Sequence, residues 1–392
     1  MSVALVTDST AYLSPAVVDV HGISVVPLHV IIAGQEHSEG VDVTADEVAA
    51  ALRSFAPVST SRPSPSAFLR AYEAAAAAGA EAIVSVHISA DMSSTIDSAR
   101  LAAEQSPVPV TVVDSRSMGM AMGYAVLSAC DAARAGASAA EVAEVARRRA
   151  EGATVVFYVD TLEHLRRGGR IGAAAALLGS ALAIKPILAL ADGRIQPLER
   201  VRTSVRALSR IEELAVSAAE AAPDGFDIAV HHLDSRSRAD GLAARLRERL
   251  GDRLSAPPAE QQAGLLADLQ AGGDSGLRVD GQAGLQVDEQ AGLDVDEQAG
   301  LQVGQQAGRQ AGQHLGRPAG QQVGEEGARS GELSGGALGG PAQGGDSGGQ
   351  PREVASGGAG AGELVVVELG AVVGAHVGPG TLAVVVSPRL GA

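Results

Sequence analysis

The fold is decided by one stretch of the sequence, AIVSVHISADMSSTIDSARLAAE, residues 82–104. Its first seven residues form an apolar run rich in β-branched side chains, which is typical of a buried strand. A helix is predicted from Ser93 to Glu104, after a short polar loop. A buried strand followed at once by a helix is the unit from which parallel sheets are built.

The same alternation extends in both directions along the chain. A capping box at Thr44–Glu47 predicts one helix, and Ser64 followed by Pro65 predicts another. Further strands are predicted at 3–7, 23–32 and 108–114, and two Ala-rich helices follow the last of these. This pattern favours an α/β domain over residues 1–153, with a parallel sheet covered by helices.

A second α/β block is predicted over residues 154–392. Its strands are expected at 154–159, 183–190, 194–201, 226–232, 363–370 and 381–388, with helices over 203–222 and 237–250. The turn Asp192–Gly193 is expected to join two of these strands as a hairpin. The prediction is therefore two α/β domains, with a ligand site between them.

A Gly- and Gln-rich insertion interrupts the second block at residues 255–362. It holds 28 of the 49 glycines, and five Arg against fourteen Asp and Glu give it a net charge of −9. So little apolar surface cannot offset the entropy lost on ordering, so we predict disorder. Strand-like sequence resumes after the segment, which makes it an insertion inside a domain.

Composition excludes several classes of protein. A net charge of −16 argues against sequence-independent binding of nucleic acid. The only cysteine, Cys130, lies in an Ala-rich helical pattern and is expected to be a buried, inert thiol. The first residues, MSVALVTDST, do not resemble a signal peptide, and residues 173–191 are predicted to be a buried helix and strand, interrupted by Lys185–Pro186. We therefore expect a soluble, cytoplasmic protein.

Hydroxyl side chains cluster in two loops that precede helices. Thr60 and Ser61 occur in the first loop, and Ser93 and Ser94 in the second. Free N–H groups and hydroxyls at helix starts suit an anion such as a carboxylate, although simple helix capping explains the same residues. If both loops end parallel strands, they converge on one crevice.

Two further segments carry candidate ligand groups. LRRGGRIG, residues 165–172, contains Arg170, whose planar guanidinium binds carboxylates or phosphates. GAHVGPG, residues 374–380, is predicted to be a tight turn that carries His376. A solvated basic turn and an incidental histidine are the plainer alternatives. We interpret DSRSMGMAMG, residues 114–123, as structural support more than as ligand contact.

Two other patterns are attributed to chance. Residues 345–349 spell GDSGG, which surrounds the nucleophile of trypsin-like proteases, but they lie in low-complexity sequence. His231 and His232 are adjacent on a predicted strand, so their side chains point to opposite faces and do not share a metal ion.

Taken together, eight motifs in this order resemble the DegV family of bacterial fatty-acid-binding proteins. They are VTDST (6–10), TSRPSP (60–65), SADMSSTIDSA (89–99), DSRSMGMAMG (114–123), LRRGGRIG (165–172), KPIL (185–188), RVRTSVRAL (200–208) and GAHVGPG (374–380). The resemblance covers about residues 1–250 and 363–387. It implies a two-domain α/β fold that binds a long-chain fatty acid between the domains and needs no cofactor.

The resemblance also implies roles for particular residues. Thr60 and Ser93 would hold the carboxylate, with Ser61 and Ser94 as weaker candidates; family members usually have Gly in place of Ser94. Arg170 and His376 would lie near the head group.

By the same resemblance, the chain is the lipid-carrying subunit of a fatty acid kinase and is not itself an enzyme. Arg202 would face the ATP-dependent kinase subunit, which forms the acyl phosphate. Transient contact with a membrane surface would serve lipid exchange.

Two alternatives stay open. The first is a serine hydrolase for acyl substrates, with Ser93 as nucleophile and His376 as base, although the sequence identifies no third group to orient the histidine. The second is an interaction protein whose acidic insertion is the functional part.

Overall fold

The computed structural model describes residues 2–177, 185–255 and 361–391. The predicted disorder of the insertion, and the GDSGG sequence within it, lie outside the described residues. The two chain ends that flank the insertion are described, and they lie side by side. Leu254 and Gly362 form a parallel β-bridge, and the Ser255 N–H donates to the Gly362 carbonyl at 2.7 Å. The chain therefore leaves and re-enters the fold at one place.

Four parallel strands form the first sheet, in the order β2-β1-β6-β7. They span Val3–Asp8 (β1), Ser24–Val26 (β2), Ala82–His87 (β6) and Val110–Asp114 (β7). The stretch at 82–104 supplies β6 and the helix α4 (Thr95–Ala103), so the predicted strand–helix unit is confirmed, with a helix that begins two residues later than expected.

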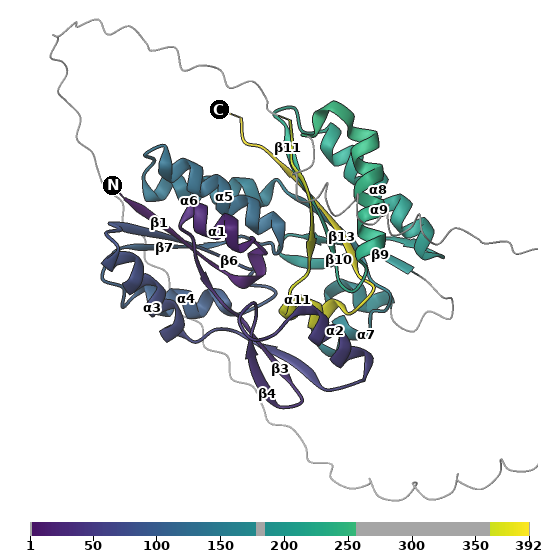
Figure 1. Ribbon diagram of the computed structural model, residues 1–392, viewed down its shortest axis with the longest axis horizontal. Helices are drawn as coiled ribbons and strands as arrows, with labels where there is room; N and C mark the ends of the chain where they lie inside the picture. Colours follow the sequence, from purple (N-terminus) through teal and green to yellow (C-terminus); the bar gives the residue numbers. More distant parts are fainter. Residues whose placement is uncertain (1, 178–184, 256–360, 392) are drawn as a thin grey trace, which may run out of the picture. The chain divides into compact units, whose positions relative to one another are not determined.

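Helices cover both faces of this sheet (Figure 1). Leu5 and Val84 pack against α5 (Met120–Arg134) and α6 (Ala139–Glu151). The alternate residues Val6 and Ile83 pack against α3 (Pro65–Ala77) and α4 on the other face. This alternation is what a strand buried on both faces requires. The shorter helix α1 (Pro15–His21) and the 3₁₀ turn η1 (Ser9–Ala11) connect β1 to β2.

Residues 23–32 do not form the single strand that we predicted. β2 ends at Val26, and β3 (His29–Ile32) pairs instead with β4 (Gln35–Ser38) and β5 (Val58–Ser61) in a separate antiparallel sheet. Pro27 explains the break, since proline has no N–H for a strand ladder. The helix α2 (Ala45–Arg53) lies between β4 and β5, and the predicted capping box opens it.

The second large sheet has six strands, in the order β10-β9-β8-β13-β11-β12. They span Thr154–Tyr158 (β8), Lys185–Ala191 (β9), Arg194–Val201 (β10), Phe226–His232 (β11), Leu364–Glu368 (β12) and Leu382–Pro388 (β13). Only β11 and β12 are parallel, because the Asp192–Gly193 hairpin reverses the chain and β13 enters antiparallel between β8 and β11.

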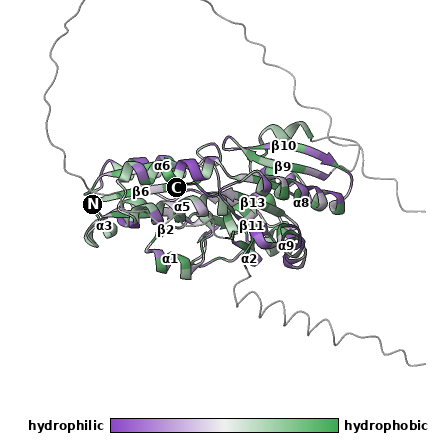
Figure 2. Ribbon diagram, turned by 90° about the horizontal axis from the view of Figure 1, so that it is seen from above, coloured by the Kyte–Doolittle hydropathy of each residue, from purple (hydrophilic) through white to green (hydrophobic). Residues whose placement is uncertain are grey.

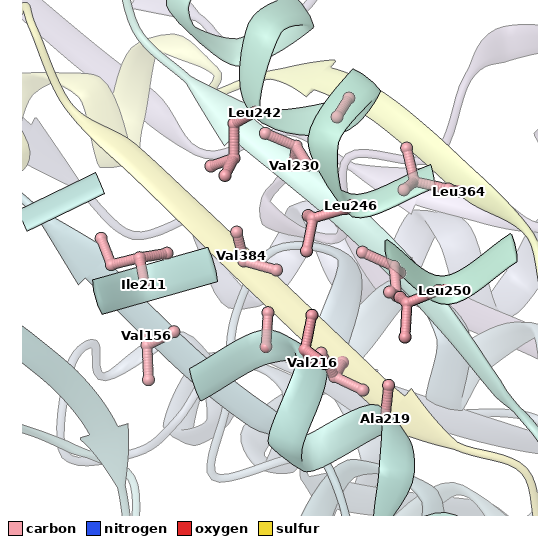
Figure 3. Packing of buried hydrophobic residues seen from close by; sticks show 14 of the residues in the cluster. Val156, Ile211, Val216, Ala219, Val230, Leu242, Leu246, Leu250, Leu364 and Val384 are labelled. Atoms are coloured by element: carbon pink, nitrogen blue, oxygen red, sulfur yellow. The ribbon is translucent and has the colours of Figure 1, made fainter. Parts of the chain in front are cut away.

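One face of this sheet is closed by α8 (Ser204–Glu220) and α9 (Arg236–Leu250), which the turn η3 (Gly251–Arg253) follows. Figure 3 shows Val156, Val230 and Val384 of the sheet facing side chains such as Ile211 and Leu246 of the two helices. Burying one such aliphatic side chain contributes about 1.5–3 kcal/mol to folding. This face is a filled core.

The opposite face of the second sheet packs against α5, α7 (Glu163–Arg167), the turn η2 (Gly172–Leu177) and α11 (Ala371–Val377). His376 lies in α11, so our prediction that residues 374–380 form only a turn was wrong. The turn occupies just the last part of that segment, Gly378–Gly380. The β-branched valines of α11 disfavour a helix in isolation, and tertiary contacts outweigh that preference.

The covering helices carry hydrophilic residues beside hydrophobic ones (Figure 2). Among the described residues, no helix combines the length and apolarity that a membrane span requires. The α/β fold class is confirmed, while the exact domain limits at 153 and 154 stay a prediction.

Candidate ligand-binding site

An apolar cavity lies against the face of the second sheet that α8 and α9 leave free. It contains about 930 Å³ of space without atoms, a volume that includes open solvent. Only about 90 Å³ of that space can hold the centre of a water molecule, so the cavity is narrow. Its apolar wall comprises Leu28, Ile88, Met92, Met118, Val155, Phe157, Leu165, Leu190, Ile195, Leu369, Val372, Val373, Val377, Ala383 and Val385.

Polar groups from distant parts of the sequence meet in the same cavity. Thr60 at the end of β5 and His376 in the last turn of α11 both line it, and Thr60 Oγ1 lies 2.8 Å from His376 Nε2. Ser61 and Ser93 line it as well, and Ser93 Oγ lies 2.8 Å from Thr95 Oγ1. The structure thus brings four of the predicted residues together.

Arg170 supplies a positive charge to this group of residues. Its Nε donates to the Met92 carbonyl at 3.0 Å, and its Nη1 donates to the Gly168 carbonyl at 2.7 Å. These two bonds fix the guanidinium, which also lines the cavity. A guanidinium held in this way has further N–H groups that can bind an anion.

Ser94 and Arg202 lie outside the cavity. Ser94 is exposed at the N-terminus of α4, where its side chain makes no capping hydrogen bond. Arg202 is exposed between β10 and α8. Neither position is among the lining residues.

The two loops that carry the hydroxyl side chains reach the same cavity, but not because both follow parallel strands of one sheet. We placed both at carboxyl ends of parallel strands, but β5 belongs to the small antiparallel sheet. The small antiparallel sheet packs against α11, and this contact places β5 beside the cavity.

His376 is uncharged at neutral pH. Burial, reinforced by the nearby guanidinium of Arg170, lowers the pKa of His376 to about 4. A neutral imidazole can either donate to or accept from Thr60 Oγ1, depending on its tautomer. The positive charge in the cavity therefore comes from the arginines that line it, Arg170 and Arg62, and not from His376.

The position of His376 depends on a glycine in the neighbouring turn. Gly168 ends α7, and a Cβ at this position would overlap His376 Nδ1 and lie 2.8 Å from Cε1. The imidazole therefore occupies the space that a side chain at Gly168 would fill.

Several lining residues were not predicted from the sequence. Tyr12 and His231 line the cavity, and so do Met118 and Gly119 from the segment that we interpreted as support. Gly119 lies very close to β11, because a Cβ at this position would be only 3.1 Å from His231 Nε2. The loop that contains Met118 and Gly119 therefore passes directly over β11. Within DSRSMGMAMG, Gly119 is the residue that signals this close approach.

A surface groove adjoins the polar residues of the cavity. It shares Thr60, Arg170 and His376 with the cavity, and it adds His164 and Arg167 from α7. A second groove, lined in part by Asp91 and Arg194, also shares Arg170. The polar groups of the cavity are therefore accessible from outside.

Ser93 and His376 are not arranged as the nucleophile and base of a hydrolytic triad. Ser93 Oγ pairs with Thr95 and His376 Nε2 with Thr60, while His376 Nδ1 has no hydrogen-bond partner among the described residues. A base without an orienting group is poorly placed to activate a serine. His231 Nε2 accepts from the Met120 N–H at 3.1 Å, and the described part of the chain contains no cluster of three potential metal ligands.

Comparison with known proteins identifies the family. The family model of the DegV family, whose members are described as uncharacterised proteins, matches residues 2–262. The chain belongs to the DegV family. The resemblance seen in the eight sequence motifs is thereby confirmed.

Relatives and solved structures agree with this assignment. The DegV domain-containing protein SCO2569 of Streptomyces coelicolor is 50% identical over 248 residues, covering 63% of this chain and 88% of the relative. A DegV family protein from Thermus thermophilus, reported as fatty acid binding, aligns with a TM-score of 0.66 at 26% identity, covering 99% of this chain and 100% of the other. DegV from Bacillus subtilis, reported as a fatty acid binding protein, aligns with a TM-score of 0.64 at 22% identity over 99% and 100%, which shows a common fold.

Proposed function

We propose that this protein binds one long-chain free fatty acid in the apolar cavity, with the carboxylate among Thr60, Ser93, Arg170 and His376. The observation that carries the proposal is a narrow apolar cavity with one fixed guanidinium and several hydroxyls in its wall. Each buried methylene contributes about 0.8 kcal/mol, so a long acyl chain supplies most of the affinity. The fatty acid reported for the Thermus relative supports this choice of ligand.

The protein then presents the carboxylate to an ATP-dependent kinase subunit. A carboxylate oxygen forms a bond to the terminal phosphorus of ATP, the bond to the ADP oxygen breaks, and the product is an acyl phosphate. The groove beside Thr60 and His376 supports this step, because it opens the polar part of the cavity to a partner and adds Arg167 near the reacting groups. Arg202 contributes to the partner-facing surface.

The ligand exchanges through transient contact with a membrane surface in the cytoplasm. Phe55 supports this route, because it is 83% exposed and lines the groove beside the polar residues. An exposed aromatic ring is suited to the interface of a bilayer. A Phe55→Ala variant should slow the transfer of palmitate from vesicles without changing its equilibrium affinity.

The main test is extraction of the purified protein followed by mass spectrometry. A bound fatty acid, and uptake of added palmitate or oleate, are expected; their absence would refute the proposal. A Thr60→Ala, Ser93→Ala double variant should have lower occupancy, whereas Ser209→Ala with Ser217→Ala on the exposed side of α8 should not. Covalent labelling of Ser93 by a fluorophosphonate would instead favour the hydrolase.

A further inference from the structure

Glu39 is a buried carboxyl group that is not among the residues lining the cavity. It follows β4 and is 5% exposed. Its Oε1 accepts from the Val372 N–H at 2.8 Å, and its Oε2 accepts from the Ser9 hydroxyl. Neither partner is charged, and no ion pair of Glu39 occurs in residues 2–177, 185–255 or 361–391. A carboxylate buried without a cation is costly to ionise.

Glu39 is connected to the cavity through helix α11. Val372 is the second residue of α11, and the N-cap, Gly370, has no side chain to satisfy the N–H groups of the first turn. Glu39, which precedes Val372 by 333 residues in the sequence, accepts a hydrogen bond from one of these N–H groups and so caps the helix. The fit is close, because a Cβ at Gly370 would overlap Glu39 Oε1 and lie 2.6 Å from Tyr12 Cε1.

The same helix holds His376 at its other end. A rise of 1.5 Å per residue separates Val372 and His376 by about 6 Å along α11. A carboxylate held beside Thr60 and His376 would therefore lie on the order of 6–10 Å from the carboxyl group of Glu39. The cavity wall between these points is apolar, with Val372 and Val373 from α11 itself.

The titratable groups around Glu39 do not neutralise it. Asp8 at the end of β1 and Tyr12 after η1 both face it, and α11 brings only His376. His29 on β3 is directed to Glu36, with 3.6 Å between Nδ1 and Oε1. Burial, with a smaller contribution from Asp8, raises the pKa of Glu39 to about 7, although the hydrogen bonds from Ser9 and Val372 oppose the shift.

We propose that Glu39 is the group that takes up a proton when an anionic ligand enters the cavity. The inference rests on the proposed function, because it requires a ligand carboxylate beside Thr60 and His376. The ligand brings a second negative charge and expels water, and both effects favour the neutral form of Glu39. By linkage, affinity is highest where Glu39 is already protonated and falls as the pH rises through about 7.

The size of the effect follows from the separation of the two charges. The two negative charges lie on the order of 6–10 Å apart, in surroundings whose effective dielectric constant is between that of protein and that of water. Their repulsion should weaken palmitate binding by about threefold to thirtyfold from acid to alkaline pH. The carboxyl group of the fatty acid titrates in the same way whichever variant is present. The informative quantity is therefore the difference in dissociation constant between variants at each pH.

The test is a calorimetric titration with palmitate. The dissociation constant is measured across neutral pH, and proton uptake is obtained from buffers that differ in ionisation enthalpy. Wild-type protein should take up a fraction of a proton per ligand near pH 7. Glu39→Gln is isosteric, and its amide oxygen can still accept from Val372, so it should lose both the uptake and the alkaline weakening.

Two further variants separate this explanation from a general effect on folding. Glu36→Gln makes the same change of charge at a position that is 62% exposed, and it should behave like wild type. Ser9→Ala removes a hydrogen bond that favours ionised Glu39, so it should move the midpoint of the pH dependence upwards.

Unchanged proton uptake in Glu39→Gln, or an unmoved midpoint in Ser9→Ala, would overturn the inference while leaving fatty acid binding intact. Failure of the wild type to bind palmitate at every pH would overturn the proposed function, and this inference with it.

Discussion

A single methyl group at Gly168 should weaken ligand binding without unfolding the protein. Gly168 has φ −72° and ψ −9°, a conformation that alanine adopts without strain. The new Cβ, however, would overlap His376 Nδ1 and lie 2.8 Å from Cε1. Gly168→Ala therefore tests the position of one imidazole with little other disturbance.

The magnitude follows from the contacts of that ring. To bring the Cε1 contact to an ordinary 3.4 Å, the imidazole has to move by at least about 0.6 Å, and the overlap at Nδ1 requires more. Such a movement disrupts the 2.8 Å contact between Nε2 and Thr60 Oγ1. Losing one hydrogen bond beside a charged ligand group costs about 1–3 kcal/mol, which weakens binding about fivefold to a hundredfold.

The assay is displacement of a fluorescent fatty acid by palmitate, with thermal unfolding measured in parallel. Gly241→Ala is the matched control, because Gly241 lies within helix α9 and the nearest atom to its Cβ, on the flexible Arg245 side chain, is 3.6 Å away. That variant should keep its affinity. In a His376→Ala background the Gly168→Ala change should have no further effect, since the clashing ring is gone.

Wild-type affinity in Gly168→Ala would refute this reasoning. So would an equal loss of affinity with and without His376, because the effect would then come from the α7 turn and not from the ring.

Three further outcomes are expected. Replacing residues 256–360 by a short Gly/Ser linker should preserve folding and palmitate binding, because the flanking ends already meet at the bridge to Gly362. Asp227→Asn should lower the free energy of unfolding, measured by urea denaturation, by about 3–5 kcal/mol. The reason is that Arg149, which is 3% exposed, loses the carboxylate whose Oδ2 lies 2.6 Å from its Nη2. Burial lowers the pKa of His231 to about 4 from its usual 6.5. The free energy of unfolding should therefore decrease as the pH falls from about 6.5 towards 4, because the unfolded chain binds a proton there that the folded protein does not. The His231→Gln variant should lose less stability over that interval.

Each outcome has its own control. Loss of binding in the shortened protein would show that the insertion contributes to the site. Glu144→Gln breaks an exposed pair with Arg147 and should cost less than about 1 kcal/mol; a similar cost for Asp227→Asn would contradict the role of burial. His37→Gln, on the edge strand β4, should leave the acid destabilisation unchanged, and equal curves for His231→Gln and wild type would exclude the proposed titration.

Local sequence signals were reliable where they involve neighbouring residues. The capping box at Thr44 opens a helix, and the Ser64–Pro65 pair does so as well. The Asp192–Gly193 turn joins β9 to β10 as expected. These signals act through hydrogen bonds and backbone conformations within a few residues, so one segment contains all the information they need.

Interactions across the chain were not predictable in the same way. His376 was expected in a turn, yet it lies in α11, whose first turn is capped by Glu39 from a distant hairpin. Nothing in residues 371–377 signals this cap. The route by which Thr60 reaches the cavity was missed for the same reason, because it depends on the packing of β5 against α11.

The sequence determined the kinds of element, most of their limits, the family motifs, and the residue types able to bind an anion. It did so because patterning, caps and turns are properties of adjacent residues. The tertiary structure decided which strands pair, that β13 runs antiparallel between β8 and β11, and that Thr60, Arg170 and His376 share one cavity. Those outcomes depend on the total apolar area buried by elements far apart in the chain, a quantity that only the assembled fold defines.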